Sequence, residues 1–174
     1  MSDFQRVTQD DHTTIRLYLG AIRRIGIYNP ELRVEAVTEL MCFVFARDQV
    51  LMQFDVQGHR IGDDGGHIER QCYHGILPRL LAMDPNEHGW HDLFNVAHSK
   101  IESSLLSEEM IVGSWPLSEE ESRKAADDYV GRREAALTEM RKSAARSLPR
   151  RERFAVPESY ASSSRPAAVA LQPA

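Results

Sequence analysis

Apolar residues recur along most of this chain at intervals of three and four, which is the spacing of one face of an α-helix. The pattern predicts five helices, at about residues 11–26, 30–54, 66–83, 87–111 and 119–147. At the end of the second helix, Val50, Met52, Phe54 and Val56 alternate with other residues, so a short strand is an alternative there. The predicted fold class is all-α, a single bundle of about five helices.

The second predicted helix is expected to lie at the centre of the bundle. Residues 40–46 are apolar without interruption, and a segment that is apolar on every side needs neighbours on every side. Asn29 and Pro30 precede this run as a helix cap and a first helical residue. Its predicted extent is therefore Pro30 to about Phe54.

Polar residues mark other helix boundaries. Asp10 or Asp11 can cap the first helix, and Ser118 with Glu121 forms a capping box for the last one. Residues 57–66 hold four glycines and two aspartates, which predicts a loop whose aspartates cap the third helix.

The third and fourth predicted helices each show one apolar face. Pro78 lies inside the third helix and is expected to kink it. The predicted core face of the third helix is Ile68, Cys72, Ile76, Leu80 and Met83. The predicted core face of the fourth helix is Trp90, Leu93, Phe94, Ala97, Ile101 and Leu105.

Composition is consistent with one folded domain. The chain has 174 residues, of which 42% are hydrophobic and 27% charged. Cys42 and Cys72 both lie in apolar helical segments, which favours buried thiols over a disulfide or a metal pair. The sequence shows neither a secretory signal nor an apolar stretch of about 20 residues, so we expect a cytoplasmic protein without a membrane span.

Charge divides the chain into an acidic body and a basic end. Residues 1–140 carry 24 acidic and 14 basic side chains, whereas residues 141–174 carry 7 basic and 2 acidic ones. Affinity for nucleic acid depends mainly on neutralising phosphates, so the acidic body disfavours nucleic acid as a partner.

Two regions are therefore predicted, a helical bundle over residues 10–147 and an extended tail over residues 148–174. The tail is basic, rich in proline, serine and alanine, and has no helical period. Its larger apolar residues are spaced as anchors would be along a groove, and they include Phe154, Val156, Tyr160 and Leu171.

The last helix has only a narrow apolar stripe, which is typical of a helix that lies on a surface of its own body or of a partner. With the tail, this predicts a non-catalytic protein–protein interaction module, such as an adaptor, a chaperone, an inhibitor or an assembly subunit. The expected partner is another protein or a second copy of the chain, and no cofactor is expected. The predicted contact residues are Val130, Leu137, Met140, Phe154, Val156, Tyr160 and Leu171.

A metal-binding helical enzyme or sensor is the alternative hypothesis. Glu87, His91, His98 and Glu102 fall on one side of the fourth helix, and these are ligand types for zinc or iron. The same stripe is also explained by Glu–His pairs on a solvated helix side, or by histidines that sense pH near neutral. No local catalytic motif accompanies it, so the sequence itself names no reaction.

Overall fold

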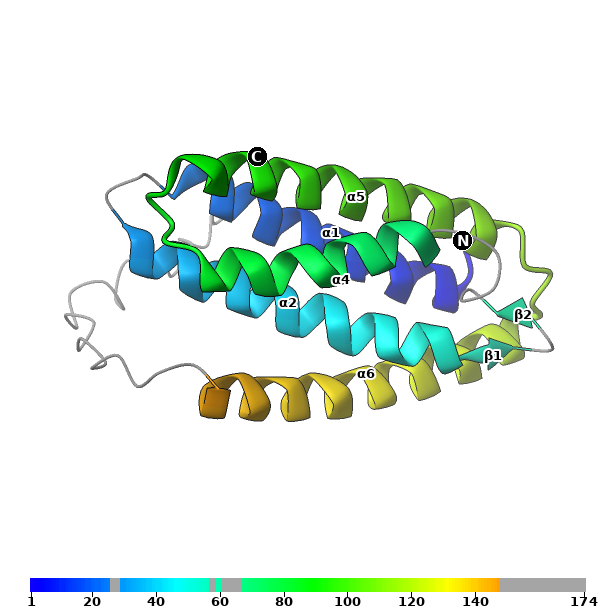
Figure 1. Ribbon diagram of the computed structural model, residues 1–174. Helices are drawn as coiled ribbons and strands as arrows, with labels where there is room; N and C mark the ends of the chain where they lie inside the picture. The colour runs from blue at the N-terminus through cyan, green and yellow to red at the C-terminus, as the bar shows by residue number, and fades with distance from the viewer. Residues whose placement is uncertain (26–28, 57–58, 61–66, 148–174) are drawn as a thin grey trace, which may run out of the picture.

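The computed structural model describes residues 1–25, 29–56, 59–60 and 67–147, and these residues form five α-helices and one pair of short strands (Figure 1). The helices are α1 (Asp3–Arg24), α2 (Pro30–Gln53), α4 (His67–Ala82), α5 (His88–Gly113) and α6 (Glu119–Ser147). The predicted all-α bundle is confirmed for this part of the chain. The predicted tail, residues 148–174, lies outside the described residues.

The second helix has the central place that its apolar run predicts. α2 contacts α1, α4 and α6, while α5 packs against α4 and α1. Figure 1 shows α6 running beside α2 at the edge of the molecule. Pro30 begins α2 as predicted, but the side chain of Asn29 makes no capping hydrogen bond.

The helix and the short strand that were predicted as alternatives for the end of the second helix are both present, one after the other. α2 ends at Gln53, and β1 (Asp55–Val56) then pairs antiparallel with β2 (His59–Arg60). The aspartates at 63 and 64, predicted to cap the third helix, lie outside the described residues.

The prediction for the start of the first helix was wrong. α1 begins at Asp3, because Ser2 and Gln5 form a capping box in which each side chain bonds the other's backbone N–H. Phe4 is completely buried, and its backbone N–H donates to Ser122 Oγ at 2.9 Å. The helical body therefore begins before residue 10, and the polar first residues belong to it.

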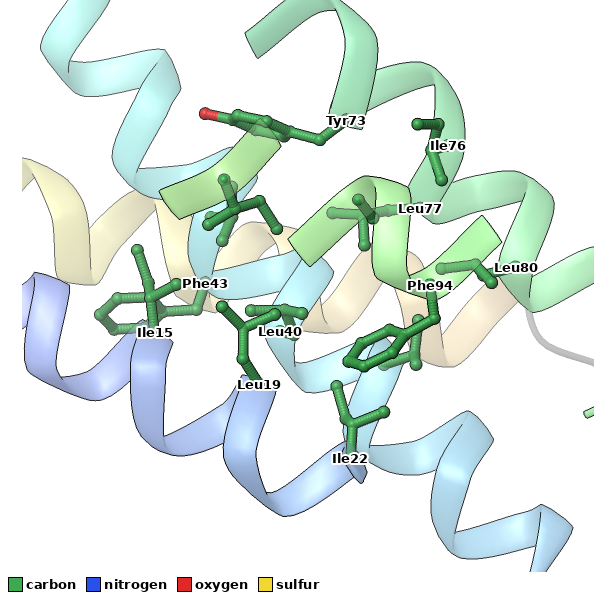
Figure 2. Packing of buried hydrophobic residues seen from close by; sticks show 14 of the residues in the cluster. Ile15, Leu19, Ile22, Leu40, Phe43, Tyr73, Ile76, Leu77, Leu80 and Phe94 are labelled. Carbon is green, nitrogen blue, oxygen red and sulfur yellow. The ribbon is translucent and has the colours of Figure 1, made fainter. Parts of the chain in front are cut away.

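Two apolar clusters fill the bundle. The larger one lies among α1, α2, α4 and α5, where Figure 2 shows Leu19, Leu40, Leu77 and Phe94 directed toward one another. The smaller one lies at the end of the bundle that holds Phe4. Its buried members are Phe4, Val50, Leu51, Phe54, Val56, Val112, Ala125 and Tyr129. At that end Trp115 stacks on Phe4 with ring centroids 5.6 Å apart.

The predicted core faces are confirmed in most positions. On α5, Leu93 is only partly buried, and the other predicted residues are buried. On α4 the face is turned relative to the prediction, because Arg70, Tyr73 and Leu77 also point inward, and Ile68 is 75% exposed. Pro78 lies within α4.

The start of α6 follows the prediction. Ser118 Oγ accepts from the Glu121 N–H, and Glu121 Oε2 accepts from the Ser118 N–H, which completes the predicted capping box. None of the helices in the described part of the chain combines the length and apolarity that crossing a bilayer requires.

Candidate functional site

A layer of polar side chains separates the two apolar clusters, and we call it the polar layer. On α1, for example, Asp11 and His12 fall between Phe4 of the smaller cluster and Ile15 of the larger one. All five helices contribute to it. Its members are Asp11, His12, Arg47, Asp48, Arg70, Tyr73, Ser104, Glu108, Tyr129 and Arg133.

Arg47 of α2 lies at the centre of the polar layer. Its guanidinium forms an ion pair with Glu108 of α5, and its Nη1 lies 3.2 Å from Asp48 Oδ1. Glu108 also receives bonds at 3.3 Å from Arg70 Nη2 of α4 and from Ser104 Oγ. Both Arg47 and Glu108 are about 1% exposed. One guanidinium and one carboxylate therefore connect α2, α4 and α5 inside the bundle.

Asp11 connects the layer to α6. Its carboxylate accepts from the Tyr129 hydroxyl and pairs with Arg133, both on α6, and lies 3.8 Å from Arg47 Nε. α6 is otherwise a strongly polar helix, so these buried contacts, together with Leu137, position it against α1 and α2.

The pKa values of Glu108 and Asp11 are shifted in opposite directions. Burial raises the pKa of Glu108, but Arg47 and the hydrogen bonds from His12 and Arg47 lower it further than burial raises it, so its pKa lies well below the usual 4.5. For Asp11, burial raises the pKa, and the nearby Arg47, Tyr129 and Arg133 offset only part of that rise.

His12 lies between Arg47 and two glutamates of α5. Its Nε2 lies 2.7 Å from Arg47 Nη2 and 3.3 Å from Glu108 Oε2. Its Nδ1 lies 2.9 Å from Glu109 Oε1. Besides His12, the layer holds three guanidiniums and the three carboxylates of Asp11, Asp48 and Glu108, so these formal charges balance.

The polar layer reaches the surface at His74. Its Nε2 lies 2.8 Å from Asp48 Oδ2, which also accepts from the Tyr73 hydroxyl at 2.6 Å, and its ring stacks on Phe45. The fully buried carboxylate of Asp48 therefore orients the partly exposed imidazole of His74. We expect a buried ionic layer of this kind to specify how the helices pair, because a shifted helix would leave charges without partners.

α6 forms one wall of a groove of about 620 Å³, and the last part of α2 forms the other wall. Its apolar surface comes from Val50 of α2 and from alanines and a methionine of α6. Polar side chains border this surface on both helices. The lining residues are Gln49, Val50, Gln53, Arg132, Ala135, Ala136, Glu139, Met140 and Ser143.

The predicted contact residues of α6 differ in whether they pack on the chain's own body alone or also line the groove. Leu137 is 5% exposed and belongs to the larger apolar cluster, and Val130 packs against the smaller one. The narrow stripe thus packs on the chain's own body, and Met140 is the one member that also lines the groove. The predicted contact residues Phe154, Val156, Tyr160 and Leu171 lie outside the described residues, so their role stays a prediction.

The proposed metal ligands are spread along one side of α5. Glu87 and His91 are exposed near its start. Farther along, His98 Nε2 lies 3.8 Å from Glu102 Oε1, and Glu102 also accepts from Arg16 Nε at 3.1 Å. Burial lowers the pKa of His98, Arg23 lowers it further, and Glu102 opposes both. Among the described residues no three His, Cys, Asp or Glu side chains form a group that could hold a metal ion. The metal hypothesis stays a prediction.

The sequence interpretation missed the polar layer. Asp11 was interpreted as a helix cap, and Arg47, Asp48 and Glu108 were not singled out. A signal was present, because Arg47 and Asp48 interrupt the most apolar segment, and Glu108 continues the buried stripe three residues after Leu105. Charged residues at core positions of several helices indicate a buried network.

Comparison of the chain with protein-family models, with curated proteins and with solved structures gives no match. The functional argument therefore rests on the groove and on the residues that position its walls.

Proposed function

We propose that this protein is a non-catalytic interaction module that binds an extended segment of a protein partner in the groove between α2 and α6. The groove itself is the observation that carries the proposal. Its volume of about 620 Å³ lies within the range of about 300–1,000 Å³ that is typical of ligand sites.

The chemistry of the lining favours a peptide chain with apolar side chains. Val50, Ala135, Ala136 and Met140 offer apolar contact, and the Gln49 and Gln53 side chains carry amide groups that can bond an extended backbone. The small alanines leave room for a larger side chain of the partner. The acidic body favours a segment with basic residues near its apolar anchors.

A pair of matched substitutions tests this site. Ala135→Arg places a long cation in the groove, whereas Ala145→Arg makes the same change at an exposed position of α6 outside it. Peptides are selected from a random phage-displayed library against the full-length chain, and their affinities are measured by fluorescence anisotropy. We expect Ala135→Arg to weaken binding at least about tenfold, which is about 1.4 kcal/mol, and Ala145→Arg to leave it unchanged. Selected peptides that bind both variants as tightly as the unaltered chain would refute the proposal.

A further inference from the structure

The face of α2 that borders the groove continues as an acidic row toward the start of the helix. At about 100° per residue, Glu31, Glu35 and Glu39 fall in the same sector of α2 as Gln49 and Gln53. The row is therefore an extension of the groove along one helix face.

The acidic row also lies beside the end of α6. Arg141 of α6 donates to Glu39 Oε2 at 2.7 Å, so the two helices are in contact at this point. Glu35 and Glu31, one and two turns nearer the start of α2, are exposed and form no ion pair with another described residue. Two negative charges are therefore available where the chain leaves α6.

From these observations we propose that the chain's own residues 150–156 fold back beside α6 and occupy the groove as an intramolecular ligand. This inference rests on the proposed function, because it names the first occupant of the same site. The segment reads RRERFAV, so three arginines and one glutamate precede Phe154, Ala155 and Val156. Along the path from the end of α6, the basic residues would meet the acidic row first, and the apolar residues would then meet the groove.

The lengths agree with this arrangement. α6 rises about 1.5 Å per residue, so Met140 and Ala136 lie about 10 and 16 Å before the end of the helix. An extended chain advances about 3.3 Å per residue, so Phe154 and Val156 reach about 16 and 23 Å back from a reversal at Pro149. Proline is common in such turns. Both anchors therefore reach the apolar part of the groove.

Phe154 and Val156 are two residues apart, which would place both side chains on the same side of an extended chain. Side chains two residues apart point to one face of a strand, so Phe154 and Val156 can enter the groove together while Ala155 faces away. Over the first part of the path, Arg150, Arg151 and Arg153 pass the acidic row, where opposite charges attract.

Occupation by a linked segment should suppress binding of the same segment from solution. A short linker gives an effective concentration on the order of 1 mM. If the free segment binds with a Kd of about 0.1 mM, the linked copy raises the apparent Kd of a competing peptide about tenfold.

The test uses a fluorescein-labelled peptide of residues 149–158, PRRERFAVPE, with anisotropy as the readout. It is titrated into three full-length chains: unaltered, Phe154→Ser/Val156→Ser, and Tyr160→Ser/Leu171→Ser. The last variant is the matched control, because it also removes one aromatic and one aliphatic residue of the tail. We expect the Phe154→Ser/Val156→Ser chain to bind the peptide about tenfold more tightly than the other two. Adding Ala135→Arg to that chain should abolish the gain.

Three results would overturn this inference, and the first of them leaves the proposed function intact. Equal binding by all three chains, sensitive to Ala135→Arg, overturns the intramolecular ligand and retains the groove as a peptide site. Binding that is absent from all three chains, or insensitive to Ala135→Arg, overturns this segment as a groove ligand. If the unaltered chain is a dimer by light scattering and only Phe154→Ser/Val156→Ser makes it a monomer, the tail binds in a second copy and the intramolecular form is wrong.

Discussion

Replacement of Arg47 by methionine should destabilise the fold more than any surface arginine replacement. Arg47 is about 1% exposed and faces the carboxylates of Glu108, Asp48 and Asp11. Arg47→Met keeps a long apolar side chain but leaves the polar layer with three carboxylates and two guanidiniums. Removing one partner of a buried ion pair typically costs about 3–5 kcal/mol, against a total stability of about 5–15 kcal/mol.

Urea denaturation followed by circular dichroism measures this loss. With a denaturant slope of about 2 kcal/mol per molar, a loss of about 4 kcal/mol lowers the midpoint by about 2 M. Arg6→Met is the matched control, because Arg6 is 62% exposed and pairs with Asp3 on the surface, where such pairs contribute about 0–1 kcal/mol. Arg47→Lys keeps the charge without the planar fork and should fall between the two. A midpoint for Arg47→Met within about 0.5 M of that for Arg6→Met would refute the central role of Arg47.

Three further predictions follow from the same contacts. Glu108 has a folded pKa below its unfolded value of about 4.5, so its carboxylate stabilises the fold above pH 4.5. That contribution is lost as the pH falls toward the folded pKa. Urea midpoints measured from about pH 7 to pH 3 should therefore fall less steeply with pH in Glu108→Gln than in the unaltered chain. Tyr129→Phe removes a buried donor from Asp11 and should cost about 1–3 kcal/mol by the same assay, and a midpoint equal to the unaltered one would contradict the bond. Leu137→Ala should cost about 2–5 kcal/mol because it leaves a cavity between α6 and the larger cluster, and a smaller loss than in the half-buried Met140→Ala would show that α6 is not fixed there.

Local signals were sufficient for most of the fold. Pro30 and the Ser118 capping box act through their own turn, so the starts of α2 and α6 were predicted correctly. The start of α1 was missed because the cap was assigned to Asp10 or Asp11, although Ser2 and Gln5 had the spacing of a capping box. Such boundaries depend on neighbouring residues and can be found without knowledge of tertiary contacts.

The candidate site depended on tertiary contacts that periodicity does not contain. Apolar spacing identified Leu137 as part of a stripe, but it could not tell whether the stripe faces the chain's own body or a partner. Glu108 and Arg47 are 61 residues apart, and only the tertiary packing of the bundle brings their side chains together. Ile68 shows the reverse case, because it has the correct spacing for the α4 core face and yet points outward.

The charge balance of the polar layer constrains how this sequence can change. A neutral or reversed residue at position 47 or 108 creates an unpaired buried charge, so it is tolerated only with a compensating change at a contacting position. Diverged versions of this chain should therefore show paired substitutions among residues 11, 47, 108 and 133, with opposite signs retained or both charges replaced by apolar residues. Such covariation would identify distant relatives by their buried charges where overall sequence similarity has been lost.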